Sequence, residues 1–279
     1  MTQILTSGTL YLVGTPIGNL EDMTLRGIRI LQEVDLIAAE DTRHTGKLLH
    51  HLQIATPQIS YHEHNQDSRT TELILKLHAG QKIALVSDAG MPSISDPGYV
   101  LVKKAIAESI PVVPIPGVSA GITALVASGL MTERFVFEGF LPAKGKARSD
   151  RLELLTQETR TIIIYEAPHR LLRTLQDLAK TLDDTRAIVL ARELTKVHEE
   201  FWRGDLASAI ALYLGERQPK GEYTLVLEGA TETNLIMSED ELKVELQQLL
   251  DRGMTRSQAS RQLAKSTSLS RREIYQLDL

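Results

Sequence analysis

The stretch LYLVGTPIGNLEDMT, residues 10–24, places a short apolar run directly before a loop of Gly, Pro and Asn. An apolar strand that leads through such a loop into a helix is typical of the start of a parallel α/β sheet. Loops of this kind often hold phosphate, but Gly14 and Gly18 match neither the G-x-G-x-x-G nor the G-x-x-x-x-G-K-[ST] spacing. Pro16 also lacks the amide hydrogen that a phosphate site would use. We therefore expect this loop to approach a bulky group closely and not to bind an anion.

Strand-like and helical segments alternate on both sides of residue 117. Before it, short β-rich runs at 9–13, 35–39, 82–87 and 111–115 alternate with helical spacing at 24–34, 41–52, 68–80 and 99–109. After it, strand-like runs at 134–140, 160–167, 185–193, 199–204 and 222–229 are interleaved with helices around 147–157, 168–182 and 205–214. The uncharged segment 116–130 predicts a buried helix between the halves. The sequence thus predicts an α/β fold with two α/β domains, 1–117 and 118–232, and a helical appendage over 238–279.

The composition is that of an ordinary globular protein. Of 279 residues, 42% are hydrophobic and 24% are charged. The chain has no cysteine, so neither disulfides nor thiolate metal sites can form. The first residues lack the basic start of a signal peptide, and no apolar run reaches the roughly 18 residues of a membrane helix. We therefore expect a cytoplasmic protein with no membrane partner.

Positive charge is concentrated in two places, although the net charge is −5. Residues 252–272 hold six basic side chains and no acid, and the stretch KGKARSDR at 144–151 holds four basic residues and one acid. Basic clusters on an acidic body favour an anionic polymer as partner, while a solvated face remains the alternative. The tail has the rhythm of two short helices around a Ser/Thr-rich turn. It resembles a helix-turn-helix, and an ordinary helical pair fits equally well.

Polar residues gather where two of the predicted strands end. The turn-rich segment SDAGMPSISDPG, 87–98, follows the strand at 82–87, and open α/β sheets bind ligands at the carboxyl ends of their strands. Asp88, Ala89 and Gly90 are therefore ligand candidates. We expect Asp96 to cap a helix that begins at Pro97.

The second polar cluster, AEDTRHTGKLL at 39–49, follows the strand at 35–39. Asp41 can cap the next helix, and Glu40 lies about where a dinucleotide fold places its ribose-binding acid. Arg43 and His44 stand beside these two acids. Because a helix cap needs only one of these four residues, the cluster indicates a polar site.

Two other kinds of site find little support. His62 and His64 in YHEHN would share one face of an extended segment, but no third ligand is evident, so we predict no metal site. The G-x-S-x-G nucleophile elbow is absent, which leaves a hydrolase triad without its anchor.

Eight segments along the chain together resemble one known family. They are GTPIGNLEDMT (14–24), AAEDTRHTGKLL (38–49), LVSDAGMPSISDPGY (85–99), PIPGVSAGITALVASGL (114–130), FEGFLPAKGK (137–146), YEAPHRLL (165–172), LARELTK (190–196) and KGEYTLVLEG (220–229). In this order and spacing they are similar to the bacterial ribosomal RNA small-subunit methyltransferase I family. That family belongs to the tetrapyrrole-methylase superfamily, the class III S-adenosylmethionine methyltransferases. The resemblance implies two α/β domains of tetrapyrrole-methylase type with the cofactor in the cleft between them, in a homodimer.

The resemblance also implies a reaction. It is S-adenosylmethionine-dependent methylation of the ribose 2′-hydroxyl of a cytidine in the decoding region of 16S ribosomal RNA, so the implied partner is 16S rRNA or the small ribosomal subunit. TPIGN replaces the more glycine-rich loop of corrin and porphyrin methylases, which favours the RNA branch. A small-molecule, tetrapyrrole-type methyltransferase and a catalytically inactive ribosome-assembly RNA-binding protein remain the alternatives.

Carried over position by position, the resemblance implies cofactor contacts from both domains. They are Pro16, Gly18, Ser87, Asp88, Ala89, Gly90, Pro116, Gly117, Ser119, Ala120, Tyr165, Leu194, Lys220, Gly221, Glu222 and Tyr223. Positioning of the reactants can supply about 7–11 kcal/mol, and a general base adds a factor of about 10² to 10⁴. The candidates for such a base are Asp41, His44, Glu193 and Lys196. The candidates for RNA contacts are Arg43, Lys144, Lys146, Arg148, Arg256, Arg271 and Arg272, and no metal ion is expected.

Overall fold

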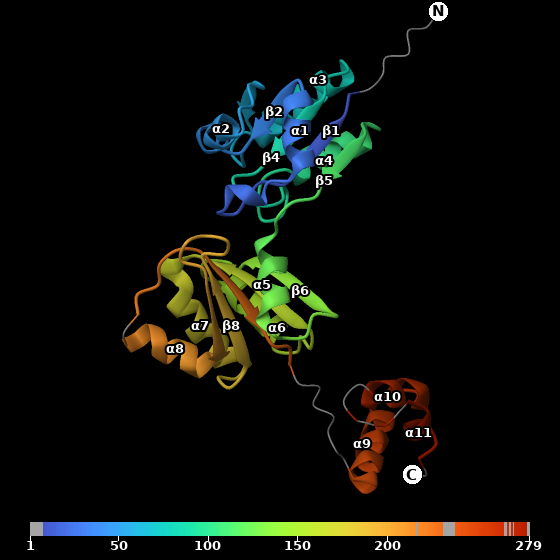
Figure 1. Cartoon of the computed structure of the whole chain (residues 1–279). Coiled ribbons are helices and arrows are strands. Elements are labelled where there is room, and N and C mark those ends of the chain that lie inside the picture. Colours follow the sequence, from blue (N-terminus) through green and yellow to red (C-terminus); the bar gives the residue numbers. More distant parts are fainter. Residues whose placement is uncertain are drawn as a thin grey trace, which may run out of the picture. The chain divides into compact units, whose positions relative to one another are not determined.

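The structure, a computed structural model, describes residues 8–215, 217–230, 238–264, 267, 269 and 271–277. The chain divides into two compact units, residues 1–228 and 229–279. The first unit contains two five-stranded sheets, and the second is helical (Figure 1).

The first sheet is entirely parallel. Its strands are β1 (Leu10–Val13), β2 (Leu36–Ala39), β3 (Gln58–Ser60), β4 (Ile83–Val86) and β5 (Val112–Ile115), in the order β3-β2-β4-β1-β5. The helices between them are α1 (Leu25–Glu33), α2 (Thr42–His51), α3 (Gln66–His78) and α4 (Tyr99–Ala107). One apolar core joins the sheet to α1 and α2, and a second core joins it to α3 and α4. Because helices cover both faces, the central strand β4 is apolar and buried throughout.

The second sheet is mostly antiparallel. Its strands are β6 (Phe135–Phe140), β7 (Thr161–Glu166), β8 (Ala187–Arg192), β9 (Glu200–Asp205) and β10 (Tyr223–Leu227), in the order β6-β7-β10-β8-β9. Only the pair β6–β7 is parallel. The helices α6 (Lys146–Leu155), α7 (Pro168–Leu182) and α8 (Leu206–Gly215) share the larger core of this sheet. The helix α5 (Ala120–Ser128) shares the smaller one.

The structure confirms the predicted α/β fold and each of the predicted strands and helices of this unit, with ends that differ by a few residues. The strand β3 was not predicted, because its three residues, QIS, form a partly polar strand at the edge of the sheet. The prediction of a buried helix over 116–130 was only half right. Gly121 and Leu125 of α5 are buried, whereas the side chains of Ile122 and Val126 are exposed.

The second unit consists of α9 (Glu239–Asp251), α10 (Arg256–Leu263) and α11 (Arg271–Tyr275). Leucines of α9 and α10 pack with Ile274 of α11 into a separate apolar core. Capping boxes at Ser238 and Thr255 begin the first two helices. The predicted pair of short helices in the tail is thus confirmed, while Lys265 of its basic cluster lies outside the described residues. Among the described residues, no helix is long and apolar enough to span a membrane.

Candidate functional site

The loops after β1 and β4 are joined at the carboxyl edge of the first sheet. The Thr15 amide donates to the Gly90 carbonyl at 2.9 Å, and the Gly90 amide donates to the Thr15 carbonyl at 3.0 Å. The Thr15 hydroxyl donates to the Ser87 carbonyl at 3.1 Å. The opening loop of the sequence is therefore held against the SDAG segment, which brings two predicted ligand-binding stretches together.

Two carboxylates join the end of β2 to the end of β4. The Asp88 carboxylate accepts the Asp41 amide at 3.1 Å, and the Glu40 carboxylate accepts the Asp88 amide at 3.2 Å. Both strands are parallel and adjacent, so their carboxyl ends lie at the same edge. The reciprocal hydrogen bonds fix two acidic side chains at that edge.

Two hollows meet at this edge. The first, which we call the loop hollow, has a volume of about 460 Å³. The second, which we call the acidic hollow, has a volume of about 400 Å³. The loop hollow is lined by Thr15, Pro16, Ile17, Gly18, Leu20, His44, Thr45, Leu48, Ser87, Asp88, Ala89, Lys196 and Glu222. The acidic hollow is lined by Ile17, Glu40, Asp88–Met91, Ile94–Asp96, Ser119, Ala120, Phe140, Tyr165–Pro168 and Glu222–Thr224. The two share Ile17, Asp88, Ala89 and Glu222, so residues from both sheets form one continuous site.

The acidic hollow is unusual in its charge. Five carboxyl groups line it, and no Lys, Arg or His does so among the described residues. The acids are Glu40, Asp88, Asp96, Glu166 and Glu222. Such a lining favours a ligand that carries positive charge.

Burial raises the pKa of two of these acids. Burial, followed by the negative charge of Glu40, raises the pKa of Asp96 to about 7, against a hydrogen bond from Ser87 that acts to lower it. Burial also raises the pKa of Glu40, and the nearby carboxylate of Asp88 adds to this effect. A carboxyl group whose pKa is near neutral at the wall of a hollow is typical of a functional site.

Aromatic side chains, among them Tyr165 and Phe140, also line the acidic hollow. The Tyr165 ring makes edge-to-face contacts with Phe137 and Phe140, with centroids 5.0 and 5.7 Å apart. Its hydroxyl accepts the Gly121 amide at 3.0 Å, which links the end of β7 to the start of α5. The hollow therefore offers a rigid flat surface beside its acids.

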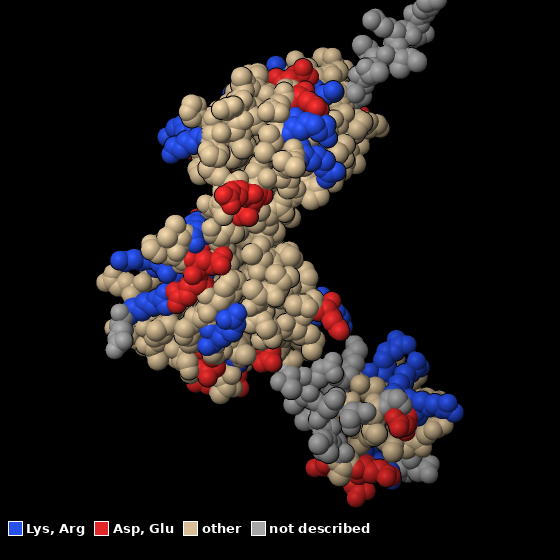
Figure 2. Space-filling model, viewed as in Figure 1, with Lys and Arg blue, Asp and Glu red and all other residues tan. Residues whose placement is uncertain are grey.

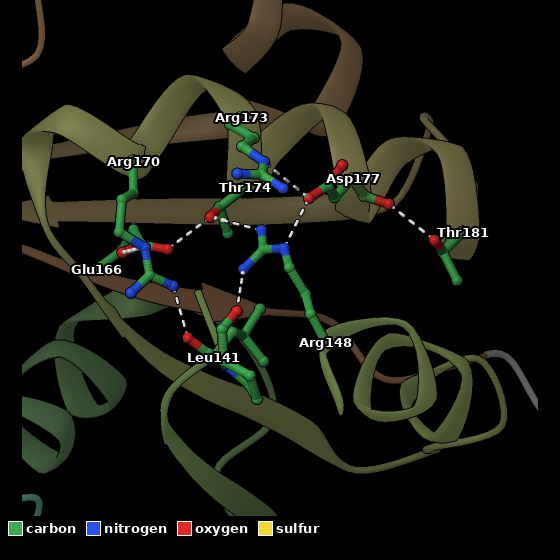
Figure 3. Close-up of polar contacts among 9 residues, drawn as sticks. Leu141, Arg148, Glu166, Arg170, Arg173, Thr174, Asp177 and Thr181 are labelled. Atoms are coloured by element: carbon green, nitrogen blue, oxygen red, sulfur yellow. Dashed lines mark hydrogen bonds and ion pairs between the residues drawn. The ribbon is translucent and has the colours of Figure 1, made fainter. Parts of the chain in front are cut away.

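Glu166 is the one fully buried acid of this wall (Figure 3). Its side chain has an exposed fraction of 0%. It accepts the Ala167 amide at 2.8 Å and the Thr174 hydroxyl at 2.5 Å, and it pairs with the Arg170 guanidinium at 3.2 Å. These contacts compensate the charge of the Glu166 carboxylate, so it helps to hold the wall of the hollow in place.

Arg148 extends this buried network and contradicts its predicted role as an RNA contact. It is 4% exposed and donates to Asp177 at 2.8 Å, to Thr174 at 2.9 Å and to the Pro142 carbonyl at 3.0 Å (Figure 3). The sequence predicts that the basic stretch 144–151 lies on the surface, but the side chain of Arg148 in this stretch is buried. The helical position decides this, because Arg148 lies on the face of α6 that also buries Leu152 and Leu155.

The four predicted base candidates differ in their surroundings. Asp41 caps α2, and hydrogen bonds from Arg43 hold its pKa well below the ordinary range. Partial burial acts to raise the pKa of Glu193, but hydrogen bonds from Lys196 and the Glu222 amide leave it lowered. Burial acts to lower the pKa of Lys196, and its bonds to Glu222 and Glu193 leave it raised. These three groups are held in their charged forms, so they are poor proton acceptors.

His44 is the remaining base candidate. It lines the loop hollow from the first turn of α2, and its side chain is exposed there. Among the described residues, its ring takes part in no recorded hydrogen bond or ion pair. An imidazole ring nitrogen is a common proton acceptor in general acid–base catalysis.

The predicted cofactor contacts fall into two groups. Eleven of the sixteen line the two hollows: Pro16, Gly18, Ser87, Asp88, Ala89, Gly90, Ser119, Ala120, Tyr165, Glu222 and Tyr223. The other five, which are not among the lining residues, are Pro116, Gly117, Leu194, Lys220 and Gly221. Leu194 is buried in the core beneath α5, and Lys220 receives a hydrogen bond from Arg192 at its carbonyl. The role of these five residues as cofactor contacts stays a prediction.

Gly14 and Gly18 of the opening loop lie in close contact with other parts of the protein. A Cβ at Gly14 would lie 2.7 Å from the Gly117 Cα, and a Cβ at Gly18 would lie 2.4 Å from the Lys196 Cγ. The Asn19 amide also donates to the Thr195 hydroxyl at 3.1 Å. The expected bulky neighbour of the loop is therefore, at these two positions, the protein's own backbone and side chains.

Asp96 is not the helix cap that its sequence context indicates. Gly98, with φ of +147°, precedes the first residue of α4, which is Tyr99. Ser93 and Ser95 also have positive φ values, +73° and +61°, so the loop turns before the helix begins. This geometry places the Asp96 carboxyl at the acidic hollow. In the sequence, the one signal for this position of Asp96 is that it shares a turn-rich segment with a second aspartate, Asp88.

The other predicted RNA contacts vary in how accessible they are. Arg43, Lys144 and Lys146 are exposed on the first unit. In the second unit Arg271 and Arg272 are exposed, whereas Arg256 donates to the Tyr275 and Leu277 carbonyls and so supports the helices. Figure 2 shows basic side chains gathered on this unit away from the acidic start of α9.

The YHEHN segment forms a turn after β3 and not an extended strand. His62 and His64 make an edge-to-face contact with ring centroids 6.0 Å apart. Among the described residues, no three His, Asp or Glu side chains are placed to hold a metal ion.

Comparison with known proteins agrees with this geometry. The sequence profile of the family described as Tetrapyrrole (Corrin/Porphyrin) Methylases matches residues 9–210. "Ribosomal RNA small subunit methyltransferase I" of Synechocystis sp. is 62% identical over 273 residues, which is 98% of both chains. The protein of the same name from Halalkalibacterium halodurans is 49% identical over 97% of this chain and 94% of its own length.

Solved structures show the same fold at lower identity. The uroporphyrin-III-C-methyltransferase from Thermus thermophilus is 21% identical, covers 79% of this chain and 94% of its own, and superposes with a TM-score of 0.58. The methyltransferase CobJ is 17% identical, covers 80% of this chain and 95% of its own, and has a TM-score of 0.61. The fold, the matching profile and the identity to close relatives together establish that the chain belongs to the tetrapyrrole methylase family, on the branch formed by the ribosomal RNA small subunit methyltransferase I proteins.

Proposed function

We propose that the protein uses S-adenosylmethionine to methylate the ribose 2′-hydroxyl of a cytidine in the decoding region of 16S ribosomal RNA. The observation that carries this proposal is the pair of hollows that share Ile17, Asp88, Ala89 and Glu222. One hollow suits a cationic donor and the other suits an incoming nucleotide. The name shared by relatives at 49% and 62% identity supports RNA as the acceptor.

The acidic hollow fits S-adenosylmethionine by its chemistry. When bound, this molecule supplies a methyl group activated by a positively charged sulfur. The carboxyl groups of Glu40, Asp88 and Asp96 match that charge, and Tyr165 with Phe140 offers a flat apolar surface for the adenine ring. The Thermus thermophilus neighbour has been crystallised with S-adenosylhomocysteine, which is consistent with this use of the fold.

The side chains of the loop hollow would hold and orient the nucleotide. The Lys196 ammonium is kept protonated by Glu193 and Glu222 and can contact a phosphate oxygen. His44 is placed to accept the proton that leaves the ribose hydroxyl. The junction of the two hollows thus aligns the hydroxyl oxygen with the donor, and this alignment accounts for most of the rate.

RNA binding outside the hollows depends on exposed cations of both units. Arg43 carries an 88% exposed side chain next to the loop hollow, and Lys144 and Lys146 are exposed on the loop and first turn of α6. Arg271 and Arg272 of the helical unit add phosphate contacts. These contacts position the RNA, while a nucleotide turned out of its stack enters the hollow.

A homodimer is part of the proposed function. The strand β6 lies at the edge of its sheet, and two of the four phenylalanines in the chain, Phe135 and Phe137, are exposed on it outside the hollows. Ile122 and Val126 of α5 are exposed as well. A second copy of the chain would cover these side chains, because an uncovered apolar edge strand promotes aggregation. Light scattering should report twice the mass of one chain.

The experiment that tests the proposed function compares 16S rRNA from a strain lacking this gene with RNA from strains that carry it. Mapping of 2′-O-methyl groups should show one cytidine that is modified only when the gene is present. The variant Asp88→Ala should leave that cytidine unmodified. If the methylation map is the same with and without the gene, or if a porphyrin precursor is methylated instead, the proposed function is wrong.

A further inference from the structure

We propose that Asp96 makes the binding of S-adenosylmethionine proton-coupled, so that the site distinguishes the charged donor from its uncharged thioether product. This inference rests on the proposed function and names a specificity-determining residue for it. It follows from the placement of Asp96 in the acidic hollow and from the partners of the other acids there.

Asp96 differs from the other four acids in its partners. Glu166 is paired with Arg170, and Glu222 is paired with Lys196 at 2.8 Å. The carboxylates of Glu40 and Asp88 each accept a backbone amide. Asp96 has the hydroxyl of Ser87 beside it, and none of the recorded ion pairs among the described residues includes it.

The charged and titratable groups around Asp96 come from several elements. Glu40 comes from the end of β2 and Asp88 from the loop after β4. Tyr165 of β7 lines the same acidic hollow. On its other side a third hollow, about 660 Å³, is lined by Asp96 together with His62, Glu63, His64 and Tyr99, among others.

In the protein without bound ligand, the Asp96 carboxyl group keeps its proton up to near neutral pH. Its pKa is about 7, and burial is the main cause. A positive charge brought within about 4–6 Å lowers the pKa of a carboxyl group by about 1–3 units. The sulfonium of S-adenosylmethionine supplies that charge, so binding expels the proton. S-adenosylhomocysteine has a neutral sulfur, so the proton stays.

Linkage gives the expected size of the effect. Because the donor binds to the ionised form of Asp96, its affinity should fall as the pH drops below the pKa of the free site. The dissociation constant of S-adenosylmethionine should rise about fivefold to tenfold between pH 7.0 and pH 5.5. The dissociation constant of S-adenosylhomocysteine should change by less than about twofold over the same interval.

Isothermal titration calorimetry on the full chain tests this directly. Titrations of wild type at pH 7 in buffers of different ionisation enthalpy should show release of about half a proton with S-adenosylmethionine and almost none with S-adenosylhomocysteine. The variant Asp96→Asn keeps the shape of the side chain and cannot ionise. Its affinity for the donor should no longer follow the wild-type pH dependence. Comparing the variant with wild type also cancels any titration of the ligand itself, because both proteins bind the same ligand.

Glu63→Gln is the matched control, since Glu63 lines only the third hollow and is exposed. It should retain the wild-type pH dependence. Donor affinity that is equal at pH 5.5 and 7.0 in wild type, or the same proton release with both ligands, would overturn the inference while leaving the methyl transfer itself intact. Failure of the donor to bind at any pH would instead refute the proposed function.

Discussion

Replacing Arg148 tests whether the buried network of Figure 3 supports the site. Arg148→Met removes a charge-assisted hydrogen bond to Asp177 and two further bonds, to the Thr174 hydroxyl and the Pro142 carbonyl. Hydrogen bonds to charged groups contribute about 1.5–3 kcal/mol and neutral ones about 0.5–1.5 kcal/mol. Breaking a buried pair by removing one partner costs about 3–5 kcal/mol. We therefore expect the free energy of unfolding to fall by about 3–5 kcal/mol.

The assay is thermal and urea unfolding of the full chain, followed by circular dichroism. For a unit of this size each kcal/mol lowers the melting temperature by about 2–4 °C, so Arg148→Met should melt about 10 °C below wild type. Arg148→Lys should lie between the two, because it keeps the charge but cannot make three directed bonds. Lys146→Met is the matched control, since Lys146 is exposed at the start of the same helix and should leave stability within about 0.5 kcal/mol.

RNA binding separates the two interpretations of this arginine. Lys146→Met should weaken binding to a 16S rRNA fragment, and Arg148→Lys should not. The reasoning is refuted if Arg148→Met unfolds within about 1 kcal/mol of wild type and weakens RNA binding as much as Lys146→Met does. In that case the guanidinium would face the RNA and not the protein interior.

Three further outcomes are expected. Gly117→Ala should destabilise the protein by about 1–3 kcal/mol in urea unfolding, because its Cβ would lie 2.8 Å from the Gly14 Cα. Gly215→Ala should be neutral, since its Cβ would meet nothing within 4 Å, and equal effects of the two variants would contradict the close approach of the two loops. The folded state binds a proton at Asp96 more tightly than the unfolded chain does, so the free energy of unfolding falls as the pH rises from about 4 to 7. Asp96→Asn should therefore raise the unfolding free energy of the ligand-free protein by about 2 kcal/mol at pH 8, after allowance for solvent screening, and by little at pH 4. Melting curves that shift equally at both pH values would contradict this. Arg272→Ala should reduce the salt slope of RNA binding by about 1 and leave S-adenosylmethionine affinity unchanged in calorimetry; an unaltered slope would exclude this residue from the RNA contacts.

Local sequence patterns predict all but one of the strands and α-helices of the first unit, and they locate the site along the chain. Apolar runs followed by turn formers set the strands and their carboxyl ends, because hydrophobic periodicity and turn chemistry are local properties. Asp88, Ala89 and Gly90 follow β4 directly, so their presence at the sheet edge follows from the strand alone.

The partners and the burial of individual charged side chains depend on the tertiary structure. Arg148 reads as one more cation in a basic stretch, and its burial depends on which face of α6 meets α7. Asp96 reads as a cap, and its place in the acidic hollow depends on a loop with positive φ at Ser93 and Ser95. A side chain's pKa and partners depend on residues far apart in sequence, such as Glu40 beside Asp96. Local sequence patterns do not include those distant neighbours. They could therefore predict where the site lies along the chain, but not the pKa values or the partners of its acids.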